Sequence, residues 1–216
     1  MHLDRSHPAI AALHRLAAGL PADGGSFGRW LPDPRRLSSA ERMEAIRTAR
    51  GVAIDLCMRN LTQAVIGVPS LIAVRKPDGQ RLWPKGCAGS LSHKGTVVIA
   101  VLVKESTVKS VGVDLEILSP QMQAPPARLV ASEGLPGPGP DWVGRTVAFS
   151  AKEAVFKAAY PLDSSPLRFE DIALSWRFSS QNLFHALATC RGDRLFTVRC
   201  ELTDRWLVST ALPTSP

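Results

Sequence analysis

The chain has 216 residues, of which 45% are hydrophobic and 21% are charged. These proportions are typical of a soluble globular protein, and they exclude a disordered chain, a collagen-like fibre and a coiled coil. The longest uninterrupted aliphatic run, residues 97–103, is far shorter than the ~20 residues that a membrane span needs. Charged residues also interrupt the apolar N-terminal segment, so the sequence predicts neither a secretory signal nor a membrane anchor.

Charge is distributed unevenly along the chain. Residues 1–108 contain 15 of the 26 basic residues and 8 of the 19 acidic residues, so the whole net charge of +7 lies there. A basic half suits an anionic partner such as phosphate, nucleic acid or an acidic protein surface, although an arginine-rich soluble surface has the same composition. The four cysteines lie far apart without metal-site spacing, which favours reduced thiols in the cytoplasm.

The first half of the chain contains one clear helix signal. Residues 20–37 are rich in Gly, Pro and Arg and predict irregular structure. Ser38 and Glu41 form a capping-box pattern, and apolar residues at helical spacing follow, which predicts a helix of about 20 residues. Residues 65–74 predict one or two strands, and residues 97–103 predict a buried strand.

The second half combines one helix with several strands. Residues 111–117 alternate in polarity and predict a strand, whereas the Pro- and Gly-rich residues 120–140 predict a long functional loop. The remaining predictions are a helix at 142–160 and four strands at 172–178, 184–189, 195–202 and 206–212, with a hairpin turn at Arg191-Gly192-Asp193.

Two carboxylates alternate along the strand at residues 111–117. Asp114 and Glu116 share one face, roughly 7 Å apart by strand rise, while the aliphatic residues between and beside them face the core. Two such carboxylates repel unless a cation or a basic group lies between them. Oxygen-only ligands favour a hard ion such as Mg²⁺. A solvated outer face is the alternative interpretation.

The helix at residues 142–160 adds a carboxylate and a lysine. Glu153 and Lys157 are four residues apart and share one helix face. In a structural interpretation, Ser150 and Glu153 form a capping box and Glu153 pairs with Lys157. In a functional interpretation, Glu153 is a third carboxylate for the ion and Lys157 clamps a phosphate.

Residues 86–93 predict a turn that binds an anion. Its glycines and serines supply backbone and hydroxyl donors, and His93 adds a ring donor. Neither the Walker pattern nor a G-x-S-x-G nucleophile elbow is present. A turn histidine with a purely structural role is the alternative.

In this order and spacing, the motifs resemble those of the 4′-phosphopantetheinyl transferases. The closer resemblance is to the larger monomeric type that serves siderophore, peptide and polyketide synthases, including its enterobactin branch. It covers residues 38–178 well and the two ends only generally. The motifs are Trp83-Pro84, Gly89-Ser-Leu-Ser-His93, Gly112-Val-Asp-Leu-Glu116, Phe149-Ser-Ala-Lys-Glu-Ala-Val-Phe-Lys157, Tyr160-Pro-Leu and Phe169-Glu-Asp171.

The resemblance implies an α+β fold of two similar, pseudo-symmetric halves with the active site at their interface. Residues 1–108 would form the half with the basic helix and the phosphate-binding turn. Residues 109–216 would form the half with the metal carboxylates and the lysine-containing helix.

The resemblance also implies roles for the acidic and lysine residues. Asp114, Glu116 and Glu153 would hold Mg²⁺, or Mn²⁺, against the pyrophosphate of coenzyme A. Lys157 would bind the same phosphates, and Lys152 is a weaker candidate.

Further groups would bind the rest of the coenzyme A phosphates. Ser92 and His93 would contact phosphate groups, and Arg50 would bind the 3′-phosphate. The family's usual glycine before this arginine is Ala49 here, and its usual second arginine is Ile54. Other arginines are therefore further candidates for binding the coenzyme A phosphates, namely Arg35, Arg36, Arg75 and Arg81.

The implied reaction is the attack of a serine hydroxyl of an apo acyl or peptidyl carrier protein on the β-phosphate of coenzyme A, releasing 3′,5′-ADP. Asp114, Glu153 and Lys157 form the expected catalytic set, with Glu153 as base, directly or through a metal-bound water. Carrier proteins are typically acidic, so we expect the basic half and the loop 119–140 to contact them. We expect a cytoplasmic monomer without nucleic-acid or membrane partners.

Two other functions fit parts of the pattern. Three carboxylates and a lysine in a basic chain also suit a metal-dependent nuclease, but the usual acid-x-lysine strand motif is missing. A non-catalytic nucleic-acid-binding module suits the charge, but only 6% of the residues are aromatic and they are not interleaved with Lys and Arg.

Overall fold

The computed structural model describes residues 8–17, 25–30, 39–69, 81–95, 97–121, 124–130, 136, 140–162, 167–180, 182–191 and 193–214. These ranges contain the helices α1 (Pro8–Ala17), α2 (Ser39–Ile66) and α3 (Asp141–Ala159) and the short 3₁₀ helices Ala127–Leu129, Tyr160–Leu162 and Phe169–Asp171. The strands are β1 (Gly25–Trp30), β2 (Cys87–Lys94), β3 (Val97–Lys104), β4 (Gly112–Ile117), β5 (Ala173–Ser179), β6 (Leu183–Cys190), β7 (Arg194–Thr203) and β8 (Trp206–Pro213). The predicted α+β class is confirmed.

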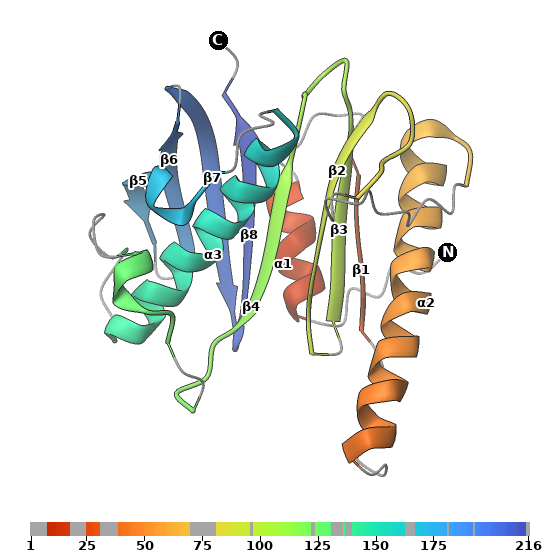
Figure 1. Ribbon diagram of the computed structural model, residues 1–216, viewed down its shortest axis with the longest axis horizontal. Coiled ribbons are helices and arrows are strands. Elements are labelled where there is room, and N and C mark those ends of the chain that lie inside the picture. The colour runs from red at the N-terminus through yellow and green to blue at the C-terminus, as the bar shows by residue number, and fades with distance from the viewer. Residues whose placement is uncertain are drawn as a thin grey trace.

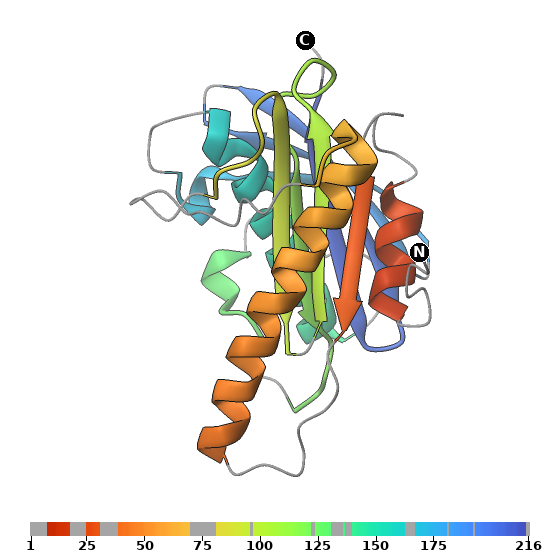
Figure 2. The same cartoon turned by 90° about the vertical axis from the view of Figure 1, so that its right-hand side faces the viewer.

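The strands form two antiparallel sheets. One sheet has the order β1-β3-β2 and the other has the order β4-β8-β7-β6-β5. The edge strands β2 and β4 lie side by side, so the two sheets meet along them (Figure 1). Helix α3 covers one face of the larger sheet, and α2 covers the outer face of the smaller one (Figures 1 and 2).

Strand β3 is buried on both faces. Its residues Val98, Ala100 and Leu102 pack against α2, whereas its alternate residues pack against α1, β4 and β8. A strand covered on both sides must be apolar throughout, which explains the continuous run of residues 97–103. The predicted strands at 97–103 and 111–117 and the four strands of the C-terminal end are confirmed.

Helix α2 is longer than predicted. It spans 28 residues and ends at Ile66; the next residue, Gly67, has a φ of 74°, and its N–H donates to the Gln63 carbonyl and closes the last turn. Val65 and Ile66 therefore belong to this helix, and the prediction of a strand starting at residue 65 is wrong there; residues 70–80 lie outside the described ranges. None of the helices that the structure describes is long and apolar enough to cross a membrane.

The segment 86–93 is a strand and not the predicted turn. The turn is confined to residues 85–86, where Gly86 has a φ of 77°, and β2 begins at Cys87. Pairing with β3 in continuous antiparallel register decides the conformation, although glycine and serine are poor strand formers. Gly89 is needed because the Trp83 ring lies against it, with ring atoms 2.6–2.7 Å from where a Cβ would be.

Helix α3 approaches β4 at backbone distance. A Cβ added to Gly112 would lie 1.8 Å from the carbonyl oxygen of Ala154. Glycine is therefore required at the start of β4, because any side chain there would push the helix away. This contact fixes the height of α3 over the strand that carries Asp114 and Glu116.

The division into two similar halves at residue 108 stays a prediction. This position lies in the connection between β3 and β4. Helix α1, from the first half, packs against β7 and β8 of the second half. The two parts of the chain therefore share a hydrophobic core.

We expect Gly112→Ala to lower the free energy of unfolding by about 1–3 kcal/mol, because the added methyl group forces α3 away from β4. Urea denaturation measures this change. Gly51→Ala is the matched control: it lies in α2, nothing lies within 4 Å of its added Cβ, and alanine there should stabilise the protein by about 0.5–1 kcal/mol. An unchanged stability of Gly112→Ala would show that α3 does not depend on this contact.

Candidate active site

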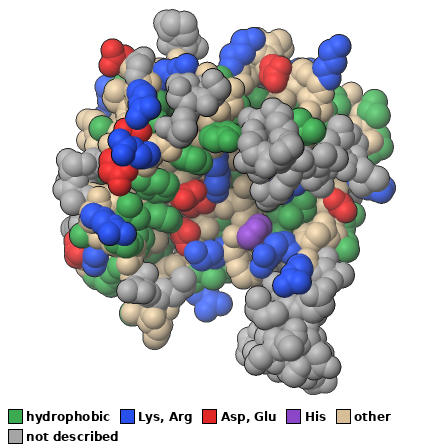
Figure 3. Space-filling model, viewed as in Figure 1, with side chains coloured by type: hydrophobic (Ala, Val, Ile, Leu, Met, Phe, Trp, Pro, Cys, Tyr) green, Lys and Arg blue, Asp and Glu red, His purple; other side chains and the backbone are tan. Residues whose placement is uncertain are grey.

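A cavity of about 760 Å³ opens where β2, β4 and α3 meet. Figure 3 shows acidic and basic side chains meeting near the middle of this face, beside a hydrophobic area. Its lining combines polar and charged residues of β2, β4 and α3 with apolar and aromatic residues, namely Trp83, Leu91, Phe149, Phe156 and Tyr160. A cavity with this mixed lining suits an anionic ligand that also has apolar parts.

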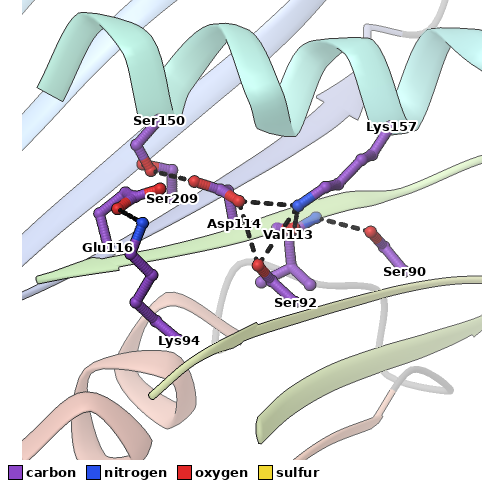
Figure 4. A network of polar contacts seen from close by, with 9 residues as sticks. All are labelled: Ser90, Ser92, Lys94, Val113, Asp114, Glu116, Ser150, Lys157 and Ser209. Atoms are coloured by element: carbon purple, nitrogen blue, oxygen red, sulfur yellow. Dashed lines mark hydrogen bonds and ion pairs between the residues drawn. The ribbon is translucent and has the colours of Figure 1, made fainter. Parts of the chain in front are cut away.

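Asp114 is at the centre of a network of polar contacts (Figure 4). Its Oδ1 accepts hydrogen bonds from Lys157 Nζ at 2.7 Å and from the Ser92 hydroxyl at 3.0 Å. Its Oδ2 accepts a bond from the Ser150 hydroxyl at 2.8 Å. Asp114 is only 4% exposed, so the interpretation of this strand face as a solvated surface is wrong. Ser92, Asp114 and Lys157 are brought together as a single site.

The members of this network come from the separate elements β2, β4 and α3. Ser92 faces β4 from the neighbouring sheet, and Ser90 on the same face accepts a bond from the Val113 N–H at 2.9 Å. Lys157 also donates to the Val113 carbonyl at 3.1 Å and to the Ser92 hydroxyl at 3.3 Å. These bonds attach β2 and α3 to β4 at the point where β2 and β4 have no backbone ladder with each other.

Ser150 does not cap a helix. Helix α3 begins at Asp141, so Ser150 lies in its third turn, where it contacts Asp114 and the Ser209 hydroxyl. The capping-box interpretation is therefore wrong. Lys157 pairs with Asp114 of another element, which also differs from a simple pair within the helix.

Glu116 forms an ion pair with Lys94. The two charged groups are 2.5 Å apart, and both side chains line the cavity. Burial raises the pKa of Glu116, and the charge of Asp114 raises it further, whereas the hydrogen bond from Lys94 opposes this rise. The ammonium of Lys94 thus balances the negative charge of Glu116 in the cavity.

Glu153 also faces the cavity. Burial raises its pKa, the charge of Lys157 lowers it, and the charges of Asp114 and Glu116 raise it again. The three predicted carboxylates therefore lie close enough to repel one another, which is an arrangement that favours a bound cation.

The residues present fit a hard divalent cation. Asp114, Glu116 and Glu153 offer oxygen donors only, as Mg²⁺ and Mn²⁺ prefer. Within the described ranges, however, no three His, Cys, Asp or Glu side chains form a finished metal site. Here two ammonium groups, those of Lys157 and Lys94, balance Asp114 and Glu116.

The predicted phosphate-binding residues differ in their positions. His93 lies on the cavity wall and is exposed, and Arg81 also lines the cavity. Arg50 lies on α2 outside the cavity lining, with a buried Nε that has no hydrogen-bond partner among the described residues. An unpaired buried N–H of this kind is a group that an anion would satisfy. Arg35, Arg36 and Arg75 lie outside the described ranges.

Lys152 points away from the cavity. It is 2% exposed, and its ammonium donates to the Phe169 carbonyl at 3.1 Å. The neighbouring residues of the motif, Glu153 and Phe149, are on the cavity side of the helix. The structure therefore does not bring Lys152 together with the other candidate phosphate ligands.

Sequence reasoning missed Lys94 and the role of Ser150. Period-two spacing of Ser90, Ser92 and Lys94 was the available signal, because in a strand these three residues share one face. That signal was hidden by the assignment of the segment to a turn. The contact of Ser150 with Asp114 was missed because Ser150 was interpreted as a helix cap.

Three curated relatives are similar to this chain over most of its length. The 4′-phosphopantetheinyl transferase PptT of Mycobacterium tuberculosis is 31% identical over 200 residues, covering 84% of this chain and 85% of the relative. Enterobactin synthase component D of Salmonella austin is 31% identical over 215 residues, covering 92% and 84%. The 4′-phosphopantetheinyl transferase Npt of Nocardia iowensis is 29% identical over 169 residues, covering 71% and 73%. No family model matches the chain.

We expect Glu153→Gln to stabilise the metal-free protein at pH 7. The pKa of Glu153 is raised above its ordinary value of 4.5, so its ionisation disfavours the folded state, and glutamine removes that charge. The gain should disappear as the pH falls below 4.5, where the carboxyl group is protonated in both the folded and the unfolded chain. Urea denaturation with a chelator at pH 7 and at a pH below 4.5 measures both effects. Glu170→Gln, at an exposed position, should change neither value.

Proposed function

The chain belongs to the 4′-phosphopantetheinyl transferase family, and on that premise we propose that it transfers the 4′-phosphopantetheine group of coenzyme A to a serine of apo acyl or peptidyl carrier proteins, with Mg²⁺, and releases 3′,5′-ADP. The family and the transferase activity predicted from the motifs are confirmed by these relatives. Membership of this family favours the transferase over the nuclease and the nucleic-acid-binding module.

The observation that supports this proposal most is the convergence of Asp114, Glu116, Glu153 and Lys157 in one cavity. Phosphoryl transfer needs positioning and charge neutralisation more than covalent chemistry from the protein. Lys157 is suited to charge neutralisation, because its ammonium is held in a fixed position in the cavity by Asp114, Ser92 and the Val113 carbonyl. Ser92 and His93, on β2, would add donors for the phosphates.

Asp114, Glu116 and Glu153 would hold the Mg²⁺ or Mn²⁺. When bound, the ion would neutralise the charge of the pyrophosphate. Glu153 would accept the proton of the carrier's serine hydroxyl, as its raised pKa suits a base. The serine oxygen then bonds to the β-phosphorus, and the bond from that phosphorus to the oxygen of 3′,5′-ADP breaks, with the electron pair leaving on 3′,5′-ADP.

The carrier protein would approach past the segment that follows β4. A second cavity of about 310 Å³ lies there, lined by Ser119, residues 124–126 and Trp142, and it shares Lys94, Glu116 and Phe149 with the main cavity. We therefore place the contact with the carrier on the loop 119–140. We also propose a monomer in the cytoplasm, which agrees with four buried free cysteines.

The central experiment mixes the purified protein with an apo carrier protein, coenzyme A and Mg²⁺ and weighs the intact carrier by mass spectrometry. We expect the mass of one phosphopantetheine group to be added and the addition to stop with a chelator. Glu153→Gln should slow the transfer by about a hundredfold or more, because it removes the base. Glu170→Gln should transfer at the parent rate.

If several types of carrier gain no mass, calorimetry with coenzyme A decides between two explanations. Binding of coenzyme A would leave a narrow choice of carrier as the explanation. Absence of both binding and transfer would contradict the proposed function.

Charge reversal should weaken the carrier contact selectively. Arg128 is exposed in the loop 119–140, so Arg128→Glu should raise the KM for an acidic carrier several-fold and leave the KM for coenzyme A unchanged. The matched control is Lys109→Glu, at an exposed basic position beyond the opposite end of β4. Equal changes in both KM values, or equal effects of the two variants, would place the carrier elsewhere.

A further inference from the structure

Lys94 lies where the two cavities join. It is the last residue of β2, and its side chain lines both the main cavity and the smaller cavity beside the loop 119–140. Its ammonium is 2.5 Å from a carboxylate oxygen of Glu116 (Figure 4). The pair is unequal in exposure: the Lys94 side chain is 33% exposed, whereas that of Glu116 is 14% exposed.

The two lysines of the site are held in different ways. Lys157 is fixed by three acceptors, namely Asp114, Ser92 and the Val113 carbonyl. Lys94 reaches Glu116 from the end of a strand, with a long side chain that is a third exposed. A long side chain that is open to solvent can leave its partner without disturbing the core. Of the two lysines, Lys94 is therefore the one with fewer contacts to hold it in place.

We propose that Lys94 is a built-in counter-ion of Glu116 that competes with the divalent cation, so the ion must displace its ammonium to bind. This inference rests on the proposed function, because it takes Glu116 as one of the acids that hold the ion. It assigns Lys94 a positioning role: the residue keeps Glu116 aimed into the cavity until the ion arrives.

The charges around the cavity support this role. Burial opposes the ionised forms of both Glu116 and Glu153, and each carboxylate is further opposed by its acidic neighbours. The charge of Lys94 lowers the pKa of both glutamates, so it compensates the acids on this side as a metal ion would. Two positive charges beside the same carboxylate repel each other, so the Lys94 ammonium weakens the binding of a divalent ion to Glu116.

Binding of Mn²⁺ to the full chain without coenzyme A tests the competition directly, since electron paramagnetic resonance measures the free ion. We expect Lys94→Met to lower the Kd for Mn²⁺ by about fivefold, the size of effect of losing one partly screened ion pair. Lys94→Arg keeps the charge and should keep the parent Kd within about twofold, given the same partly screened pairing. Lys109→Met, at an exposed position away from the cavities, should also bind as the parent does.

An unchanged or weaker affinity of Lys94→Met for Mn²⁺ would overturn the proposal. Thermal unfolding checks that each variant is folded, and Lys94→Gln replaces Lys94→Met if methionine prevents folding. The transfer assay separates this outcome from failure of the proposed function. If the parent protein modifies its carrier while Lys94→Met shows no gain in Mn²⁺ affinity, the counter-ion role of Lys94 is contradicted and the proposed function is not.

Discussion

The close contact between α3 and β4 at Gly112 is the constraint on which the rest of the site depends. Because the helix backbone lies directly on the strand, Ser150 and Lys157, two turns apart on α3, both reach Asp114. If the helix moved away from the strand by the width of one methyl group, these hydrogen bonds would lengthen. Hydrogen bonds weaken steeply as they lengthen and bend. The packing of one glycine therefore sets the position of a charged group that must lie close to its partner.

The charged groups of the site oppose folding but favour the binding of charged ligands. Three carboxylates and two lysines share one cavity, and burial raises the pKa of Glu116 and Glu153. Such a cluster lowers the stability of the fold, but a divalent ion and a polyanionic ligand would each find partners of opposite charge already in place. Asp114 differs from the other two acids, because two hydroxyls and an ammonium take up three of its about four acceptor positions and leave one for the ion. These bonds fix the position of Asp114 in the site.

Much of this architecture could be predicted from the sequence. Period-two alternation placed Asp114 and Glu116 on one face of a strand, and helical spacing placed Glu153 and Lys157 on one face of a helix. The segment 86–93 could not be assigned locally, because its glycines and serines favour turns and only its register with β3 makes it a strand. Lys94 was missed for the same reason. Arg50 and Lys152 show a second limit, since a motif names residues but tertiary packing decides which of them face the cavity.

Because the site lies at the junction of two sheets, we expect the chain to act only when both sheets are assembled. Strand β2 belongs to the smaller sheet, whereas β4 and α3 belong to the larger one, and no backbone ladder joins β2 to β4. Side chains of the site itself make that connection: Ser90 bonds to the backbone of β4, and Ser92 bonds to Asp114. The same polar groups that would bind the ligand thus hold the sheets in register. Ligand binding at this seam should stabilise the contact between the sheets, because any group that binds only the assembled site favours the assembled state.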